Sequence, residues 1–383
     1  MFSNWNYPTQ VLVGAGRIQE LASICKQRKI IAPLLVTDKD LAKFSFVSDL
    51  LAQCRDEGLD IEIFTQIKPN PTGSNINLGI DAFKSGHHDA VIAIGGGSAL
   101  DAGKAIALVA NQDCDLFELE DIGDNWTRAD NTKIVPTIAI PTTAGTGSEV
   151  GRAAVIINEN QQRKTIIFHP LMMPECVILD PELTLGLPAT LSAATGMDAL
   201  SHSLEAFCAP TYHPMAEGIA IEGIRLVKAY LPIVVADGSN IEARTQMLVA
   251  SMMGATAFQR GLGAMHALAH PLGSVFDAHH GMLNAILMPY VLKANQRAIS
   301  SSISRLTKYL GIDNGFDGFL SWVLELRKEL NIPHTLDQII DHDIQYSRIA
   351  AMAFEDPSAS TNPILFTPSQ YEEILKSAYK GAL

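Results

Sequence analysis

The stretch that decides the fold is Ala90-Val91-Ile92-Ala93-Ile94-Gly95-Gly96-Gly97-Ser98-Ala99-Leu100-Asp101. Its first five residues are apolar, which predicts a strand that is covered on both faces. The glycines that follow let the backbone approach a ligand closely. A helix comes next, and we expect Ser98 to cap it, with Asp101 three residues later. The start of such a helix favours a bound phosphate, although a tight turn without a ligand has the same pattern.

Further apolar runs recur through the first half of the chain, at residues 34–37, 61–64, 136–140, 155–157, 165–168 and 177–179. Helix-forming segments separate them, which predicts βαβ units and a mostly parallel sheet. After residues 180–182 strand-like runs largely vanish, and the stretches 242–258 and 302–330 are rich in helix formers. We therefore expect an α/β domain over residues 1–182 and an all-α domain over residues 183–383. Two domains also suit a chain of 383 residues.

The last helix has its own start signal. Thr367 is expected as the N-cap, Pro368 stands at the first helical position, and Gln370 follows three residues after the cap.

Composition and charge narrow the class of protein. With 47% hydrophobic and 18% charged residues, the chain is typical of a globular protein. A formal net charge of −13 argues against nucleic acid or an anionic membrane as the main partner. The five cysteines are scattered, and neither a signal peptide nor a long apolar run is evident. We expect a cytoplasmic protein with a small-molecule partner.

A second glycine-containing loop, Pro141 to Glu149, follows the run at 136–140 and crowds threonines at a strand end. In open α/β sheets, ligands bind outside the carboxyl ends of strands, so this loop and the first one are expected to border one crevice. Asp38 ends another strand and is placed to accept the ribose hydroxyls of an adenosine and to repel a 2′-phosphate. A capping role is the alternative for that aspartate.

Four residues form a candidate metal site. Asp198 and His202 are four residues apart, so on a helix they share one face. His266 and His280 are fourteen apart in a stretch that also contains His270 and His279, and from spacing alone the choice among these four imidazoles stays open. Each histidine could instead be structural. One carboxylate with three imidazoles suits a divalent ion, which acts as a Lewis acid on an alcohol or carbonyl oxygen beside a nicotinamide.

The glycine loops and the Asp/His cluster together resemble the iron-containing, or group III, alcohol dehydrogenases. The similarity runs through almost the whole chain. Its motifs are Pro69-Asn70-Pro71-Thr72, Gly95 to Ser98 with Asp101 and Lys104, Pro141 to Glu149, Thr195 to Ala199, His266 to Gly273, His280-Gly281 and Asn362-Pro363.

The resemblance implies a dehydroquinate synthase-like architecture with the active site in the cleft between an NAD-binding α/β domain and a helical metal-binding domain. It implies that the metal, Fe²⁺ or alternatively Zn²⁺, is bound by Asp198, His202, His266 and His280. His270 would be catalytic, as a proton carrier near the nicotinamide. The implied NAD-binding residues are Asp38, Asn70, Gly96, Gly97, Ser98, Asp101, Thr142, Thr143, Thr146 and Lys164.

The activity implied is reversible hydride transfer between a small alcohol or aldehyde and NAD, in a homodimer or larger homo-oligomer. Related alternatives are a glycerol- or diol-type dehydrogenase or a lactaldehyde reductase of the same superfamily. Glycerol dehydrogenases and dehydroquinate-synthase-like lyases generally lack a ligand histidine four residues after the aspartate, so His202 discriminates against them. A protein that binds nucleotide or metal without activity would be expected to have lost one of these elements.

Overall fold

The computed structural model describes Tyr7, residues 9–341 and residues 344–383. These residues form two compact units. The α/β unit contains Tyr7–Thr143 and Gly147–Leu185, and the helical unit contains Ala144–Thr146 and Gly186–Leu383. The expected fold class, a parallel sheet with helices followed by a helical part, is confirmed. The expected assignment of residues 1–182 and 183–383 to two functional domains stays a prediction.

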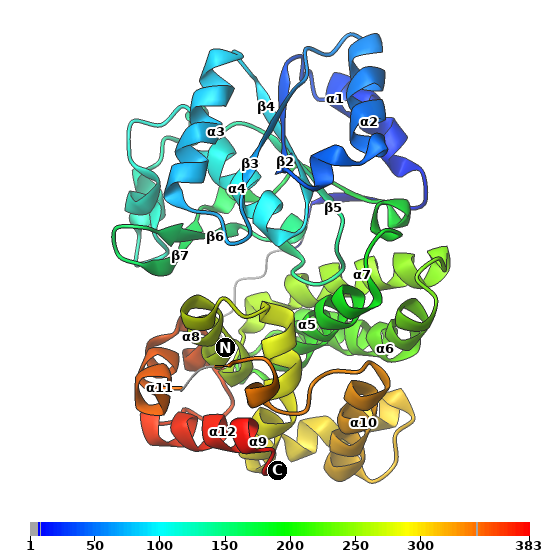
Figure 1. Cartoon of the computed structure of the whole chain (residues 1–383), viewed down its shortest axis with the longest axis vertical. Coiled ribbons are helices and arrows are strands. Elements are labelled where there is room, and N and C mark those ends of the chain that lie inside the picture. The colour runs from blue at the N-terminus through cyan, green and yellow to red at the C-terminus, as the bar shows by residue number, and fades with distance from the viewer. Residues whose placement is uncertain (1–6, 8, 342–343) are drawn as a thin grey trace. The chain divides into compact units, whose positions relative to one another are not determined.

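The α/β unit is built on a parallel sheet with the strand order β1-β8-β5-β4-β2-β3. Figure 1 labels four of these strands, β2, β3, β4 and β5. The strands of the sheet are β1 (Gln10–Val13), β2 (Pro33–Asp38), β3 (Glu62–Ile67), β4 (Ala90–Gly95), β5 (Thr137–Pro141) and β8 (Cys176–Leu179). The central strands β2, β4, β5 and β8 are almost wholly buried, which explains why they appear in the sequence as continuous apolar runs.

Helices cover both faces of this sheet. Alternate residues of a strand point to opposite faces, so Leu34 and Leu35 belong to different apolar clusters. The cluster of Leu34 includes residues of α3 (Gly73–Ser85) and α4 (Gly97–Val109). The cluster of Leu35 includes residues of α1 (Leu21–Gln27) and α2 (Ser45–Asp56). The carboxyl ends of the strands are thereby left to loops.

Two of the predicted strands lie outside the parallel sheet. β6 (Ala153–Asn158) and β7 (Arg163–Phe168) pair antiparallel as a separate ribbon. Strand β1 was not predicted, because it is a four-residue edge strand with partly exposed side chains. It is defined by its pairing with β8, more than 160 residues later in the chain.

The expected cap at the start of α4 is wrong. The N-cap residue is Gly96, with no side-chain cap hydrogen bond, and Ser98 already lies inside the helix. The backbone leaves β4 through Gly95 at a φ of 145°, and this turn starts the helix before the serine is reached. The Asp101 carboxylate bonds elsewhere, as described below.

The helical unit is an assembly of long helices with a shared apolar core. They are α5 (Ala189–Cys208), α6 (Pro214–Ala236), α7 (Ile241–Ala257), α8 (Ala264–Phe276), α9 (His280–Leu310), α10 (Gly315–Glu329), α11 (Tyr346–Glu355) and α12 (Pro368–Lys380). The described residues contain no helix that combines the length and apolar character needed to cross a bilayer.

Two predictions about individual helices differ in outcome. The N-cap of α12 is confirmed, because Thr367 and Gln370 form a capping box with Pro368 at the first position. The helix-forming stretch 302–330 is two helices, because Gly311 and Asn314 adopt left-handed φ values of 66° and 64° between α9 and α10.

Candidate metal centre and nucleotide loops

Helix α5 carries the first two candidate ligands. Asp198 and His202 are one turn apart on this 20-residue helix, and they are 3% and 5% exposed. The helix is buried over most of its length, so both polar side chains lie inside the helical unit. A buried carboxylate and imidazole require polar or ionic partners there.

The other two candidate ligands come from α8 and α9. His266 lies on α8, and His280 is the first residue of α9. One ligand atom from each of Asp198, His202, His266 and His280 can be chosen so that all four lie within 4.8 Å of one another. The structure therefore brings together the same four residues that the family resemblance implies.

The structure separates His280 from its neighbour His279. His279 is exposed and is the N-cap of α9, where its Nδ1 accepts a hydrogen bond from the Met282 amide. Because the helix begins at His280, the two adjacent side chains leave the backbone in different directions. Only His280 reaches the cluster.

The protonation states suit cation binding. Burial alone would raise the pKa of Asp198, but electrostatic interaction with the nearby imidazoles, above all that of His202, and a hydrogen bond from Asn284 lower it to about 2. Burial holds the pKa values of His266 and His280 well below the usual range for imidazole. The carboxylate is therefore ionised and these two imidazoles are neutral at pH 7, the forms in which both groups bind metals.

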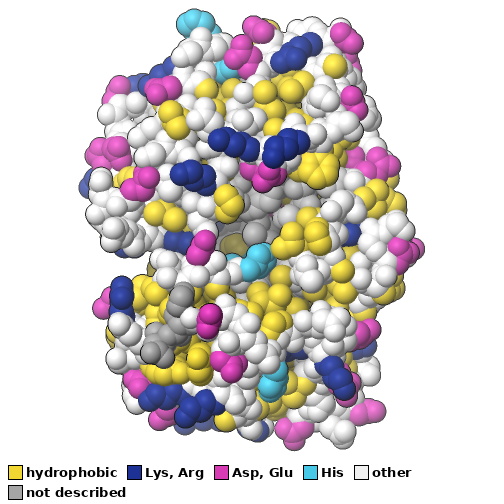
Figure 2. Space-filling view, viewed as in Figure 1, with side chains coloured by type: hydrophobic (Ala, Val, Ile, Leu, Met, Phe, Trp, Pro, Cys, Tyr) yellow, Lys and Arg dark blue, Asp and Glu magenta, His cyan; other side chains and the backbone are white. Residues whose placement is uncertain are grey.

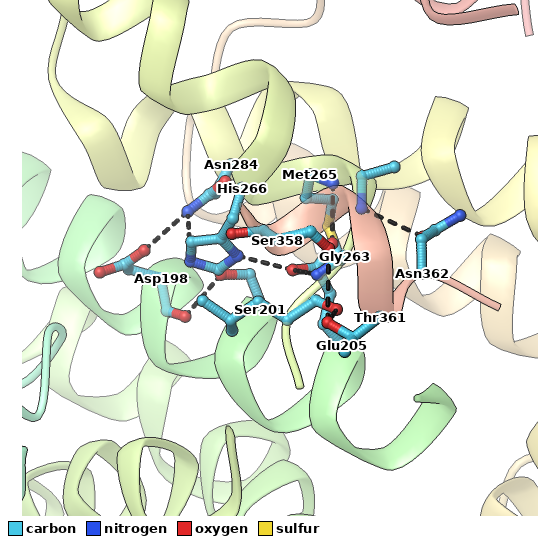
Figure 3. A network of polar contacts seen from close by, with 12 residues as sticks. Asp198, Ser201, Glu205, Gly263, Met265, His266, Asn284, Ser358, Thr361 and Asn362 are labelled. Atoms are coloured by element: carbon cyan, nitrogen blue, oxygen red, sulfur yellow. Dashed lines mark hydrogen bonds and ion pairs between the residues drawn. The ribbon is translucent and has the colours of Figure 1, made fainter. Parts of the chain in front are cut away.

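The polar contacts around His266 orient its ring (Figure 3). The Glu205 carboxylate lies 2.6 Å from Nδ1 of His266, and the Asn284 amide nitrogen lies 3.2 Å from Nε2. The same amide donates to Asp198 at 2.9 Å. With Nδ1 protonated toward Glu205, Nε2 keeps its lone pair on the side of Asp198. Glu205 and Asn284 were not predicted, because nothing in their spacing marks them.

A nitrogen of His202 is also available. Among the described residues, Nδ1 of this buried ring has no hydrogen-bond partner. The His202 ring also stacks on the His266 ring, with centroids 4.7 Å apart, and one of its nitrogens lies within 4.8 Å of the other ligand atoms. An ionised carboxylate with three imidazoles fits a divalent cation with nitrogen and oxygen ligands. The donor set thus passes the chemical test for the metal that the sequence suggested.

His270 lies beside the cluster without belonging to it. Its ring stacks on His280 with centroids 5.4 Å apart. Its Nδ1 bonds to Asp356 at 2.8 Å, and its side chain is 28% exposed. Asp356 was missed in the sequence because it comes from a distant turn after α11. The contact leaves Nε2 of His270 available to a substrate or to solvent.

The two predicted phosphate loops lie side by side in the α/β unit. Strands β4 and β5 are neighbours with Gly95 opposite Pro141, and the Thr142 amide donates to the Gly95 carbonyl at 3.0 Å. A β-carbon at Gly96 would lie 3.6 Å from the Thr143 side chain. The start of α4 carries no side-chain cap, so its first amides are not taken up by a capping oxygen, and such a helix start favours an anion.

Asp38 has the capping role that was considered for it, and its role toward the ribose stays a prediction. Its Oδ1 accepts hydrogen bonds from the amides of Asp40 and Leu41, each at 2.9 Å, which is a capping role. Its Oδ2 faces Gly95, since a β-carbon there would lie 3.9 Å away. One carboxylate oxygen therefore remains directed toward the glycine loop.

Asp101 has an internal role in the structure. Its Oδ1 accepts a hydrogen bond from the Ser148 hydroxyl at 2.5 Å and pairs with Lys104 at 3.2 Å, while Oδ2 accepts from the Val155 amide at 2.9 Å. The buried ammonium of Lys104 also donates to the carbonyls of Ser148 and Ala153. These contacts attach α4 to the end of the threonine loop and to β6. Asp101 thus holds other parts of the unit in place.

The remaining predicted cofactor residues lie on three segments. The Pro71 carbonyl accepts from the Ile157 amide at 2.8 Å, and Ile157 pairs with Lys164 across the β6–β7 ribbon, so the segment after Asn70 runs along this ribbon. Thr146 groups with the helical unit, where neighbouring Gly145 packs closely on Thr195.

On the face drawn in Figure 2, acidic and basic side chains are interspersed, and no broad basic patch is formed by the side chains visible there.

An α/β sheet with adjacent glycine and threonine loops, together with a carboxylate–imidazole cluster, defines a metal-dependent, nucleotide-linked oxidoreductase. The family model described as iron-containing alcohol dehydrogenase matches residues 8–181, and the model for the C-terminal part of that family matches residues 192–379. The chain therefore belongs to the iron-containing alcohol dehydrogenase family.

Individual proteins agree with this assignment. The chain is 35% identical to a 4-hydroxybutyrate dehydrogenase of Cupriavidus necator, over 97% of the chain and 98% of that protein. A crystal structure of 1,3-propanediol oxidoreductase superposes with a TM-score of 0.94 at 32% identity, covering 99% of this chain and 100% of that one. A sulfoacetaldehyde reductase of Bifidobacterium kashiwanohense in complex with NAD⁺ has a TM-score of 0.90 at 27% identity, covering 99% of both chains. Like its family, the chain is an alcohol dehydrogenase-type oxidoreductase.

Proposed function

We propose that this protein interconverts a small alcohol and its aldehyde with NAD, using a divalent metal bound by Asp198, His202, His266 and His280. The observation that carries the proposal is the convergence of these four side chains, with ligand atoms within 4.8 Å of one another. When bound, the metal, iron by the family's description, supplies Lewis acidity toward the substrate oxygen.

The chain's own residues prepare the site for this chemistry. Phe258 lies edge-on against the His202 ring, at 5.2 Å between centroids, and supplies an apolar wall that excludes water. His270 is held by Asp356 through Nδ1, so its Nε2 is the atom that exchanges the hydroxyl proton with solvent. We therefore assign the proton relay to His270.

NAD is assigned to the α/β unit. The pyrophosphate is placed at the start of α4, against Gly96, Gly97 and Ser98, with Thr142 and Thr143 from the adjacent loop. Asp38 is assigned to the adenosine ribose, and Asn70, Thr146 and Lys164 to the remainder of the dinucleotide. Asp101 is assigned a supporting role, because its carboxylate is bonded to Ser148 and Val155. The NAD⁺ complex of the similar sulfoacetaldehyde reductase supports the choice of cofactor.

A second candidate function is a dehydrogenase for diols or hydroxy acids. Two similar proteins favour it, because one is named 4-hydroxybutyrate dehydrogenase and another, from Citrobacter freundii, is named 1,3-propanediol dehydrogenase. Both names describe a short chain with a second polar group remote from the reacting carbon. A lactaldehyde reductase remains a related alternative within the same chemistry.

We also propose a homo-oligomer in the cytoplasm. Edge strand β1 has one strand partner, β8, among the described residues, and Val13 on it is exposed. The five cysteines are all unpaired, as expected in a reducing compartment. Sedimentation velocity on the purified chain tests the oligomer.

The decisive experiment is a screen of NAD(P)-linked oxidation with short alcohols, diols and hydroxy acids. It is run on protein stripped of metal and then loaded separately with Fe²⁺ or Zn²⁺. We expect NAD-linked turnover that depends on added metal and is greatest with a short primary alcohol or diol. No metal-dependent turnover with any alcohol would overturn the proposal.

A further inference from the structure

We propose that Glu205 is a positioning residue of the metal centre, which locks helix α8 to helix α5 and selects the nitrogen of His266 that faces the metal. This inference rests on the proposed function, since it concerns the same four ligands. Glu205 coordinates nothing itself in this proposal. It acts through His266 and through the backbone that carries His266.

The position of Glu205 on α5 allows it to act as a positioning residue for His266. Glu205 lies three residues after His202 and seven after Asp198, so all three side chains leave the same face of one helix. It is 5% exposed, which places its carboxylate fully inside the helical unit. A group this deeply buried requires close hydrogen-bonding partners.

Those partners come from the start of α8, as Figure 3 shows. Oε2 of Glu205 accepts from the Gly263 amide at 2.8 Å, and Oε1 accepts from the Met265 amide at 2.7 Å. The Asn362 side chain accepts from the Ala264 amide between them at 3.1 Å. Three successive amides are thus satisfied from outside the helix, as helix starts require.

The N-cap residue of α8 explains why a distant glutamate is needed. Gly263 has no side chain to cap its own helix. A β-carbon at this position would lie 2.9 Å from Oε1 of Glu205, so the glycine also provides the room for the carboxylate. The Glu205 carboxylate and Gly263 therefore act together to fix α8 against α5.

The third partner of Glu205 is the ligand itself. Oε2 lies 2.6 Å from Nδ1 of His266, so the ring donates its Nδ1–H to the carboxylate. The lone pair is then on Nε2, which lies on the side of Asn284 and Asp198. Carboxylates that accept from the outer nitrogen of a metal-bound histidine orient the ring and increase its basicity.

Glutamine cannot replace this carboxylate. Three N–H donors converge on its two oxygens, and all three need an acceptor. Glutamine would offer one oxygen and a competing NH₂ group, which leaves at least one buried donor facing another donor. Aspartate keeps two acceptor oxygens, but its side chain is one methylene shorter, so it reaches fewer of the three donors.

The alternative is that Glu205 only stabilises the fold, and the chain contains a matched carboxylate to test this. Asp180 is fully buried in the α/β unit and accepts from the amides of Gly16, Ile18 and Glu182. It therefore joins distant backbone segments as Glu205 does, but without a histidine. Asp180→Asn therefore measures the effect of weakening hydrogen bonds between distant backbone segments when no histidine is involved.

The experiment compares Glu205→Gln, Glu205→Asp, Asp180→Asn and His266→Ala with the wild-type chain. Zn²⁺ affinity is measured by competition with a chromophoric chelator, the visible spectrum of the Co²⁺ form reports ligand geometry, and circular dichroism with a thermal melt reports folding. We expect Glu205→Gln to bind Zn²⁺ about 10- to 100-fold more weakly and to change the Co²⁺ spectrum. Glu205→Asp should recover part of the affinity.

The controls separate the possible failures. Asp180→Asn should melt at a lower temperature while its Zn²⁺ affinity and Co²⁺ spectrum match the wild type. Wild-type affinity and spectrum in folded Glu205→Gln would overturn the inference; if that variant does not fold, the same result in Glu205→Asp would do so. If His266→Ala also keeps wild-type affinity, the proposed metal centre itself is wrong.

Discussion

The carboxylate of Asp356 holds Nδ1 of His270 at 2.8 Å while the ring of His270 stacks on His280, a member of the Asp/His cluster. The contact spans 86 residues of sequence and fixes both the tautomer and the plane of a partly exposed imidazole. A histidine fixed in this way beside a metal site is suited to carry a proton and is not itself needed as a ligand.

We predict that His270→Ala lowers kcat by about 100-fold, the usual scale for a general acid–base, while bound metal stays at the wild-type level. Asp356→Asn should lower kcat less, because the ring remains but is no longer held in one tautomer. Steady-state rates with NAD, together with elemental analysis, check both statements. Loss of metal from His270→Ala would show that His270 is a ligand.

His266→Ala should lose both bound metal and turnover while the fold persists, because it removes one of four converging ligands. The matched variant is His279→Asn, since asparagine also caps helices and His279 is the N-cap of α9. Elemental analysis and NADH assays should find His279→Asn close to the wild type. Equal metal loss in the two variants would refute the choice of His280 over His279.

Asp38→Asn should narrow the preference for NAD over NADP. The amide keeps an oxygen for the Asp40 and Leu41 amides, so the turn is retained while the negative charge is removed. Repulsion between two unit charges about 4 Å apart is on the order of 1 kcal/mol even in water, so the ratio of kcat/KM values should change by at least about fivefold. An unchanged ratio would leave Asp38 only its capping role.

Lys104→Met should weaken NAD binding and leave metal affinity intact. The substitution preserves the apolar stem of a 1% exposed side chain but removes its bonds to Ser148, Ala153 and Asp101. The end of the threonine loop then loses the Lys104 part of its attachment to α4 and retains the bond between Ser148 and Asp101. Fluorescence titration with NADH measures the effect, and Zn²⁺ competition provides the control. If Lys104→Met bound NADH as tightly as the wild type, the hydrogen bonds of Lys104 would have no role in cofactor binding.

Local sequence patterns predicted the helices and strands that are determined by residues close together in the sequence. Strand β4, its glycine turn and helix α4 follow one another within twenty residues, and burial makes β4 continuously apolar. Strand β1 depends on pairing with β8 and has no such pattern. The break at Gly311 depends on a left-handed backbone conformation, which helix propensity does not register.

The residues of the candidate site also fall into two groups, those that local spacing predicts and those that depend on contacts distant in the sequence. Asp198 and His202 were predicted as a pair because helical spacing alone places them on one face. The preference for His280 over His279 depends on where α9 begins, and the contacts of Glu205 and Asp356 depend on packing between distant helices. Spacing carries no information about those contacts, so the residues that orient the histidines appeared only in the structure.

The last prediction concerns Glu149, which is 1% exposed at the end of the threonine loop. Burial raises its pKa from an ordinary value of 4.5 to about 7, against the opposing effects of a backbone hydrogen bond and of Lys104. The folded pKa lies above the unfolded one, so this group's contribution to stability is complete below about pH 4.5 and is lost as the pH rises through 7. Glu149→Gln has no such proton to lose.

The free energy of unfolding of the wild type should therefore fall relative to that of Glu149→Gln as the pH rises from 5 to 8, with a limiting slope of about 1.4 kcal/mol per pH unit, and its melting temperature should fall with it. Glu205, whose pKa burial also raises to about 7, is present in both proteins, so its effect cancels in the difference. Thermal melts at matched metal content across this range measure that difference. Parallel pH profiles for the two proteins would show that Glu149 is ionised in the folded state, and the buried loop end would then hold a charged carboxylate beside Lys104.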